Sequence, residues 1–145
     1  MHHQQRALVL NPNDDLIVVQ HGEILTWMGE PQEGIDWVLK AMRLNPYHPE
    51  RFWNHLGRAY FVARRYADAA QAFGRISAAD HTHHAFLAAS LNRCGDTAAA
   101  ARHAREALAL TPAFRTDDYL ATLHYRHGAD REHHRQCLLD AGLPA

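Results

Sequence analysis

Apolar and small residues recur at helical spacing through most of the chain, and they are densest between residues 50 and 73. Within this stretch Trp53, Leu56 and Tyr60 follow i, i+3, i+7 spacing, so they share one face of a helix. Gly57 lies on that same face, where the missing side chain lets another helix backbone come close. The pattern predicts a helix whose apolar face packs tightly against a second helix.

The second half of the stretch supplies that partner. Ala69 and Phe73 are four residues apart and form the answering stripe, and the polar pair Arg64-Arg65 lies between the two stripes. We therefore expect two helices folded back on each other around a turn at these arginines. A hairpin this small cannot bury both of its faces, so it needs a similar hairpin on each side.

Similar stripes precede and follow this central pair. The matching positions are Val18, Gly22, Leu25, Gly34, Val38 and Ala41 before it, and His84, Leu87, Ala88, Leu91, Ala100, Ala104 and Ala107 after it. A last pair of helices has its apolar positions at Leu120, Leu123, Cys137 and Leu138. The whole pattern predicts helices over residues 15–28, 32–44, 50–63, 66–77, 82–93, 98–110, 116 to about 127, and 130–141.

Polar and conformationally special residues mark the ends of these helices. The residues suited to cap a helix N-terminus are Asn13 or Asp14, Asp80, and Asp96 or Thr97. Pro31 fits the first turn of the second helix, and Gly95 suits the left-handed end of the helix over 82–93. The helix that begins at Tyr66 has no closing proline, so we expect it to end early, near Ser77.

The central stretch resembles the tetratricopeptide repeat (TPR) signature W-x2-L-G-x2-Y…A-x3-F…A…P, and Pro12 and Pro46 are separated by 34 positions, the length of one such repeat. The resemblance implies an all-α fold, a TPR-type α-α solenoid of antiparallel helix hairpins. The expected units are the tail of a preceding repeat helix (1–14), a first repeat (15–49), a short second repeat (50–80), a third repeat (81–114), and C-terminal capping helices (115–145) that cover the open end of the stack.

Residues 4–10 match the ends of the later second helices, so we expect the chain to begin inside a repeat and to be a piece of a longer protein. The phrases ARRYADAAQAF, RLNPYHPE and LLDAGLPA also resemble the C-terminal TPR regions of bacterial class III adenylate/guanylate cyclases. This resemblance implies a regulatory fragment of a larger bacterial protein and carries over no cyclase catalytic residue.

Composition narrows the possible partners and the compartment. The 145 residues carry a formal net charge of −1, and no clustered basic face indicates nucleic-acid binding. No apolar run approaches the ~20 residues that cross a bilayer, and no secretory signal is present. Cys94 and Cys137 are far apart and outside any C-x-x-C pattern, which favours a reducing, cytoplasmic location.

The 13 histidines were considered as metal ligands and as catalytic groups. His81 and His84 share a helical face within the run His81-Thr82-His83-His84, but no cysteine or acidic residue other than Asp80 stands beside them, and zinc usually has four ligands. His124 lies near acidic residues without any nucleophile motif. We expect polar surface and packing roles for these histidines, and we predict no enzyme, no catalytic residues, no metal site and no cofactor.

In TPR proteins the first helix of each repeat lines a concave groove. Carried over by position, the predicted groove residues are Glu23, Arg51, Asn54, His55, Arg58, Phe61, Phe86 and Asn92. Arg51, Asn54 and Arg58 share one face, and two guanidiniums with an amide suit a carboxylate or an extended peptide backbone. The clamp by which chaperone-binding TPRs hold a C-terminal carboxylate is not reproduced.

The resulting hypothesis is a non-catalytic protein–protein interaction or scaffold module that holds a protein or peptide in its concave groove. One alternative is a self-association module, because Ala7, Leu8 and Leu10 would offer an open apolar face for a homodimer. Two further alternatives are a sensor domain for a small ligand and a metal-binding protein.

Overall fold

The structure is a computed structural model, and residues 15–145 of it are described below. Within this range the chain folds into helices and loops without a β-strand. The helices are α2 (Asp15–Trp27), α3 (Pro31–Leu44), α4 (Arg51–Val62), α5 (Tyr66–Phe73), α6 (His81–Arg93), α7 (Thr97–Leu110), α8 (Thr116–Leu120) and α9 (Gly128–Asp140). None of the helices in this range is long and apolar enough to span a lipid bilayer.

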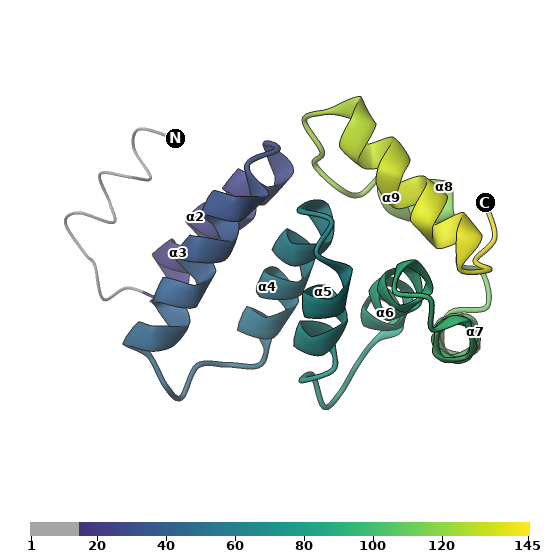
Figure 1. Ribbon diagram of the computed structural model, residues 1–145, viewed down its shortest axis with the longest axis horizontal. Coiled ribbons are helices and arrows are strands. Elements are labelled where there is room, and N and C mark those ends of the chain that lie inside the picture. Colours follow the sequence, from purple (N-terminus) through teal and green to yellow (C-terminus); the bar gives the residue numbers. More distant parts are fainter. Residues whose placement is uncertain (1–14) are drawn as a thin grey trace.

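The helices from α2 to α7 form antiparallel hairpins that stand side by side in a row (Figure 1). Helix α2 packs on α3, α4 on α5, and α6 on α7, while α3 with α4 and α5 with α6 join each hairpin to the next. This arrangement confirms the predicted all-α solenoid. The first helices α2, α4 and α6 also contact one another in sequence, so they form one layer of the row.

Small residues set how closely the two helices of a hairpin approach. A Cβ atom added at Gly34 would lie 2.8 Å from the carbonyl oxygen of Gly22, so α2 and α3 meet backbone to backbone there. A Cβ atom at Gly57 would lie 2.6 Å from the ring of Phe73, which is fully buried between α4 and α5. The glycine positions of the repeat pattern therefore fix the helix spacing in the first two hairpins.

Each hairpin turn has one residue in the left-handed backbone region, and the three residues occupy the same position in the turn. They are Gly29 (φ 86°), Arg64 (φ 63°) and Gly95 (φ 88°), each two residues after the end of the first helix. Glycine adopts this conformation without steric penalty, whereas an L-residue such as arginine is strained by roughly 1–2 kcal/mol. The turn of the middle hairpin therefore carries a strain that the other two avoid.

Most helix ends lie within a few residues of the predicted positions. Asp80 caps α6 by accepting hydrogen bonds from the backbone N–H groups of Thr82 (2.8 Å) and His83 (3.1 Å), and Asp96 caps α7 by accepting from that of Ala99 (3.1 Å). The Asn13 or Asp14 cap, the repeat fragment 1–14 and the apolar face at Ala7, Leu8 and Leu10 lie outside the described residues.

Two predicted helices were too long. Helix α5 ends at Phe73 instead of near Ser77, because Gly74 follows it and glycine disfavours helix continuation. The helix predicted over 116–127 ends at Leu120, where the guanidinium of Arg131 on α9 donates hydrogen bonds to the carbonyl oxygens of Leu120 and Leu123. A contact from a distant helix therefore ends α8, and local sequence does not encode it.

The tail, defined here as residues 115–145, does not lie flat against the last hairpin. Helix α9 packs on α6 and α8, and it crosses the row of hairpins at the ends where their turns lie (Figure 1). The backbone N–H of Arg126, just before α9, donates a hydrogen bond of 2.9 Å to the carbonyl oxygen of Trp27 at the end of α2. The tail thus reaches back to the first hairpin, which differs from the expected cap over the open end of the stack.

Candidate partner-binding surfaces

The predicted groove residues lie on the layer of first helices, and three of them meet. The carboxylate of Glu23 on α2 lies 3.7 Å from Nδ1 of His55 and 3.9 Å from Nη1 of Arg58, both on α4. These distances are those of ion pairs and are too long for hydrogen bonds. Burial lowers the pKa of His55, so its imidazole is neutral at pH 7 and Arg58 is the positive partner of Glu23.

Several buried polar atoms in this region of α4 have no hydrogen-bond partner among the described residues. They are Oδ1 of Asn54, Nδ1 of His55 and Nε of Arg58. Leaving a buried donor or acceptor unpaired costs about 1–3 kcal/mol. Together the three side chains offer an acceptor, an adaptable ring nitrogen and a cationic donor, which is the chemistry that binds a peptide backbone or a carboxylate.

Two other predicted groove residues are less closely joined to this cluster. Arg51 is exposed at the start of α4 and lies over the ring of Phe52, 5.8 Å from its centroid. Its charge contributes to lowering the pKa of His55, so it stands at the edge of the same region. Asn92 is half-buried near the end of α6.

An open hollow adjoins the cluster on the α2 side. It has a volume of about 630 Å³ and is lined by Gln20, Glu23, Ile24, Trp27, Met28 and His124. Glu23 belongs to both the hollow and the ion-pair cluster. Sequence reasoning missed the other lining residues, although Gln20, Ile24 and Trp27 follow i, i+4, i+7 spacing on α2, which is the signal that could have identified them.

The aromatic groove residues Phe61 and Phe86 are not open to solvent. They are 0% and 1% exposed, and each ring centroid lies 4.8 Å from that of His134 on α9. The chain's own tail therefore occupies the part of the first-helix layer that these residues form. A partner reaches them only when α9 moves away.

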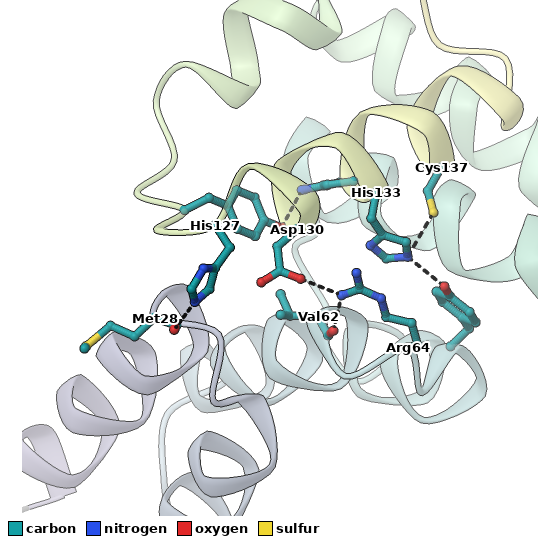
Figure 2. Close-up of polar contacts among 10 residues, drawn as sticks. Met28, Val62, Arg64, His127, Asp130, His133 and Cys137 are labelled. Atoms are coloured by element: carbon teal, nitrogen blue, oxygen red, sulfur yellow. Dashed lines mark hydrogen bonds and ion pairs between the residues drawn. The ribbon is translucent and has the colours of Figure 1, made fainter.

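The start of α9 is held by polar contacts to two hairpin turns (Figure 2). His127 lies within hydrogen-bonding distance, 3.1 Å, of the carbonyl oxygen of Met28, and its ring covers Gly29, where an added Cβ would lie 2.5 Å away. Nη1 of Arg64 donates a hydrogen bond of 3.0 Å to Oδ1 of Asp130, and it also donates to the carbonyl oxygen of Val62. Sequence reasoning placed Arg64 at a turn and gave no role to His127 or Asp130.

The second half of α9 is held by a thiol and a phenol. Nε2 of His133 shares a hydrogen bond of 2.7 Å with the Tyr66 hydroxyl, and it lies 3.4 Å from Sγ of Cys137 (Figure 2). The guanidinium of Arg93, at the end of α6, donates to Sγ of Cys137 (3.1 Å) and to Asp140 (3.2 Å). Burial raises the pKa of Cys137, so the thiol stays protonated and unreactive at pH 7 while the tail is in place.

The two adjacent histidines of α9 are buried in neutral form. Burial is the main reason why the pKa of His133 falls to about 4 and that of His134 to about 3, and the positive charges of Arg64 and Arg58, respectively, act in the same direction. His134 shares a hydrogen bond of 2.9 Å with the Tyr125 hydroxyl, but its Nε2 has no partner in the described part of the chain. Protonation of either ring would place an uncompensated charge at this interface.

Histidines elsewhere make pairs and not larger ligand groups. Nδ1 of His84 on α6 lies 3.0 Å from Nδ1 of His103 on α7, with the two rings stacked. Among residues 15–145 there is no group of three or more histidine, cysteine or acidic side chains placed to hold one metal ion.

Comparison with known proteins gives matches in structure and not in sequence. No model of a protein family matches the chain, and no curated protein matches it either. Similar solved structures include two crystal structures of MamA, with TM-scores of 0.70 and 0.69 at 18% identity; they cover 95% of this chain and 82% and 76% of theirs. The crystal structure of YrrB, described as a TPR protein with an unusual peptide-binding site, aligns with a TM-score of 0.66 at 18% identity, covering 96% of this chain and 66% of its own.

At this level of identity the likeness establishes the fold. The stacked hairpins, their glycine contacts and the agreement with these structures along 95–96% of the chain point the same way. The chain has the fold of a TPR-type α-solenoid.

Proposed function

We propose that this chain is a protein-interaction module that binds an extended segment of a partner protein on its open first-helix face. The binding surface consists of the hollow along α2 and the adjoining cluster of Glu23, Asn54, His55 and Arg58. YrrB, a structural neighbour, is described as having a peptide-binding site, which supports a peptide as the kind of ligand that this fold binds.

The observation that carries the proposal is the set of unpaired polar atoms on α4. Each unpaired buried polar atom is costly. A surface that serves packing alone would therefore be expected to give hydrogen-bond partners to the Asn54 carbonyl, the His55 ring nitrogen and the Arg58 Nε, or to have apolar residues in their place. These atoms are covered in the free chain, so a bound peptide backbone would supply N–H donors and C=O acceptors to them once the side chains turn outward. The apolar side chains Ile24 and Trp27 beside them would hold one side chain of that peptide.

A selection from a displayed peptide library tests this proposal. The full chain is immobilised, binders are selected, and their affinities are measured for the wild type and for the double variant Asn54→Ala/Arg58→Ala. We expect the double variant to lose at least about tenfold in affinity, because two polar anchors are removed. Arg105→Ala, which removes an exposed guanidinium from α7, is the matched control and should leave affinity unchanged. Binders that ignore the double substitution would refute the proposed surface.

In its parent protein the module would act as a regulatory or scaffolding part, and a bacterial nucleotide cyclase remains the predicted context. The phrases shared with the C-terminal TPR regions of such cyclases support this prediction. Sequencing the gene around the segment tests it, since a cyclase domain upstream is expected. The second candidate, a homodimer, would be supported by concentration-dependent mass in light scattering.

A further inference from the structure

The tail is built as a separate unit that meets the hairpins with one face. Its two ends are joined to each other, because the backbone N–H groups of Thr116 and Asp117 donate to the carbonyl oxygens of Pro144 (2.9 Å) and Ala145 (3.0 Å). The side chain of Arg135 adds an ion pair of 2.8 Å from α9 to Asp117. These contacts join the two ends of the tail, while its apolar residues, such as Leu120 and Leu138, share one hydrophobic core with the hairpins.

The face of α9 that meets the hairpins has a simple pattern. Asp130 binds Arg64, His134 packs between Phe61 and Phe86 one turn later, and Leu138 is fully buried one further turn on. Spacing of i, i+4, i+8 is that of an amphipathic helix lying in a groove. The hairpins therefore present a cationic contact, an aromatic contact and an apolar contact in a straight line.

Arg64 is a specific indication that this surface is used for binding. It occupies the left-handed turn position that glycine holds in the other two hairpins, and it is the residue whose guanidinium binds Asp130. Backbone strain of this kind persists where the side chain has a role that glycine cannot fill. Here that role is to bind an acidic residue near the start of a helix.

The tail has unpaired buried polar atoms of its own, in addition to those of the hairpins at residues such as His21 and Ser90. Buried polar atoms without partners in the described residues include His134 Nε2, Thr116 Oγ1 and the Tyr119 hydroxyl, all in the tail. Burial raises the pKa of Tyr119 to about 12, so this hydroxyl is protonated and uncharged. Because these atoms cost free energy and α9 meets the hairpins with one face alone, we expect the tail to open without separating the hairpins.

We infer that the surface covered by α9 is a docking site for an amphipathic helix of another protein, which replaces α9 and carries an acidic residue, a ring one turn later and an apolar residue one further turn on. This inference rests on the proposed interaction function and adds a second surface with its own regulation. The resident tail competes for the site, so the affinity for the partner helix is reduced by the fraction of molecules that are closed.

A labelled synthetic peptide of residues 123–145, which contains α9, tests the inference. Its binding to the full chain is measured by fluorescence anisotropy for the wild type and for Asp130→Ala, in which the tail loses its contact to Arg64 but the surface is intact. We expect the variant chain to bind the wild-type peptide more tightly, by up to about fivefold, because a partly exposed ion pair no longer keeps the tail closed. His127→Ala, which removes the contact to Met28, serves as the second variant if Asp130→Ala does not fold.

Two controls make the result specific. Glu132→Ala also removes a carboxylate from α9, but Glu132 is exposed and pairs within the same helix at 3.9 Å, so the peptide affinity should stay at the wild-type value. A peptide that itself carries Asp130→Ala should bind the Asp130→Ala chain more weakly than the wild-type peptide does, by the same factor. Equal affinities of the wild-type, Asp130→Ala and His127→Ala chains would overturn the inference.

The outcome also separates this inference from the proposed function. Suppose that a library-selected peptide still binds the open face, but the Asp130→Ala chain binds the 123–145 peptide no more tightly than the wild type does. This result would refute the helix site alone. Conversely, suppose that the Asp130→Ala chain binds the 123–145 peptide more tightly while no selected peptide loses affinity for the Asn54→Ala/Arg58→Ala variant. This result would refute the open-face proposal alone. A dimer of the Asp130→Ala chain in light scattering would assign the site to a second copy's tail and overturn the assignment to a different protein.

Discussion

The interfaces between helices of the hairpins and the interface under the tail use different chemistry. The hairpins meet through glycine, alanine and phenylalanine, with Ala41, Ala59, Ala69, Ala85 and Ala88 all fully buried. The tail shares a hydrophobic core with the hairpins through residues such as Leu138, but it also meets them through histidine, arginine, aspartate, tyrosine and cysteine, and it leaves polar atoms unpaired. The first kind of interface is mostly apolar, although it also buries His21 between α2 and α3, whereas the second depends more strongly on charge and protonation. The difference indicates a permanent scaffold that carries a part able to detach.

Replacing Phe73 tests the permanence of the scaffold and has the largest expected effect. Its ring is fully buried between α4 and α5 and stacks on Phe86 with a centroid distance of 4.8 Å. Phe73→Ala should lower the free energy of unfolding by about 3–5 kcal/mol, since it removes a buried ring and leaves a cavity. Urea denaturation followed by circular dichroism measures this. Tyr47→Ala, at a side chain that is 92% exposed, should change stability by less than about 0.5 kcal/mol.

A substitution of Phe73 with little effect would mean that the hairpins are held together elsewhere. It would also contradict the difference between the two regions, because the hairpins would then be packed no more firmly than the tail.

The close approach of α2 and α3 provides a second test of the scaffold. A methyl group at Gly34 would lie 2.8 Å from the backbone oxygen of Gly22 and from Oγ1 of Thr26, and the backbone oxygen cannot rotate away. Gly34→Ala should therefore destabilise by about 1–3 kcal/mol, although alanine favours a helix. Gly128→Ala is the matched control, because nothing lies within 4 Å of its added Cβ, and it should be neutral or stabilising. Equal effects of the two substitutions would contradict the close-packing explanation.

Acid pH should open the tail and leave the hairpins closed. The pKa of His134 is lowered to about 3 in the folded chain, against 6.5 for an open imidazole, so the open form takes up the proton first. The stability of the tail is therefore complete above pH 6.5 and is lost as the pH falls from 6.5 towards the folded pKa, by about 2 kcal/mol at pH 5. His133, whose pKa is lowered to about 4, adds to the same trend.

Hydrogen exchange resolved by peptide, normalised to the unfolded chain at each pH, measures this opening. Residues 128–140 should lose protection at pH 5 while α4 and α5 keep theirs. His134→Gln, which does not titrate, should reduce the pH dependence. Parallel loss of protection in the tail and the hairpins would show that the two regions unfold together.

The sequence predicted the scaffold well because its signals are local and repeated. Stripes such as Trp53, Leu56 and Tyr60, the caps at Asp80 and Asp96, and the turn glycine Gly95 each act within one hairpin. The prediction that Glu23, His55 and Arg58 line one groove was carried over by position from the TPR resemblance, and their distances in the structure place them together. Their use by a partner stays a prediction.

The position of the tail could not be predicted in the same way. Its contacts join residues far apart in sequence, such as Arg64 with Asp130 and His127 with Met28, and no repeat pattern relates them. The sequence showed Phe61 and Phe86 as groove residues, but burial under His134 depends on where α9 docks. Arg64 in a glycine position was the one local sign of this contact, and it becomes informative only when the three turns are aligned.

Arg64→Gly tests whether the tail can open without a loss of stability in the hairpins. Among the substitutions other than the controls, it should have the smallest effect on the free energy of unfolding of the whole chain. The substitution removes the ion pair to Asp130, worth about 0.2–1 kcal/mol for a partly exposed pair, and it also relieves the left-handed strain of the turn. The two changes nearly cancel, so the free energy of unfolding should shift by less than about 1 kcal/mol.

The tail of the same variant should open several times more often, and the chain contains its own reporter. Cys137 on α9 is fully buried where the tail meets the hairpins, whereas Cys94 is exposed at the turn of the third hairpin. The rate of alkylation at Cys137, divided by the rate at Cys94 in the same sample and read by mass spectrometry, should rise by up to about fivefold in Arg64→Gly. Arg65→Ala, which removes the neighbouring guanidinium that pairs with Asp68 at 2.9 Å, should leave the ratio unchanged. An equal rise in both variants would mean that the charge of the turn, and not the contact from Arg64 to Asp130, keeps the tail in place.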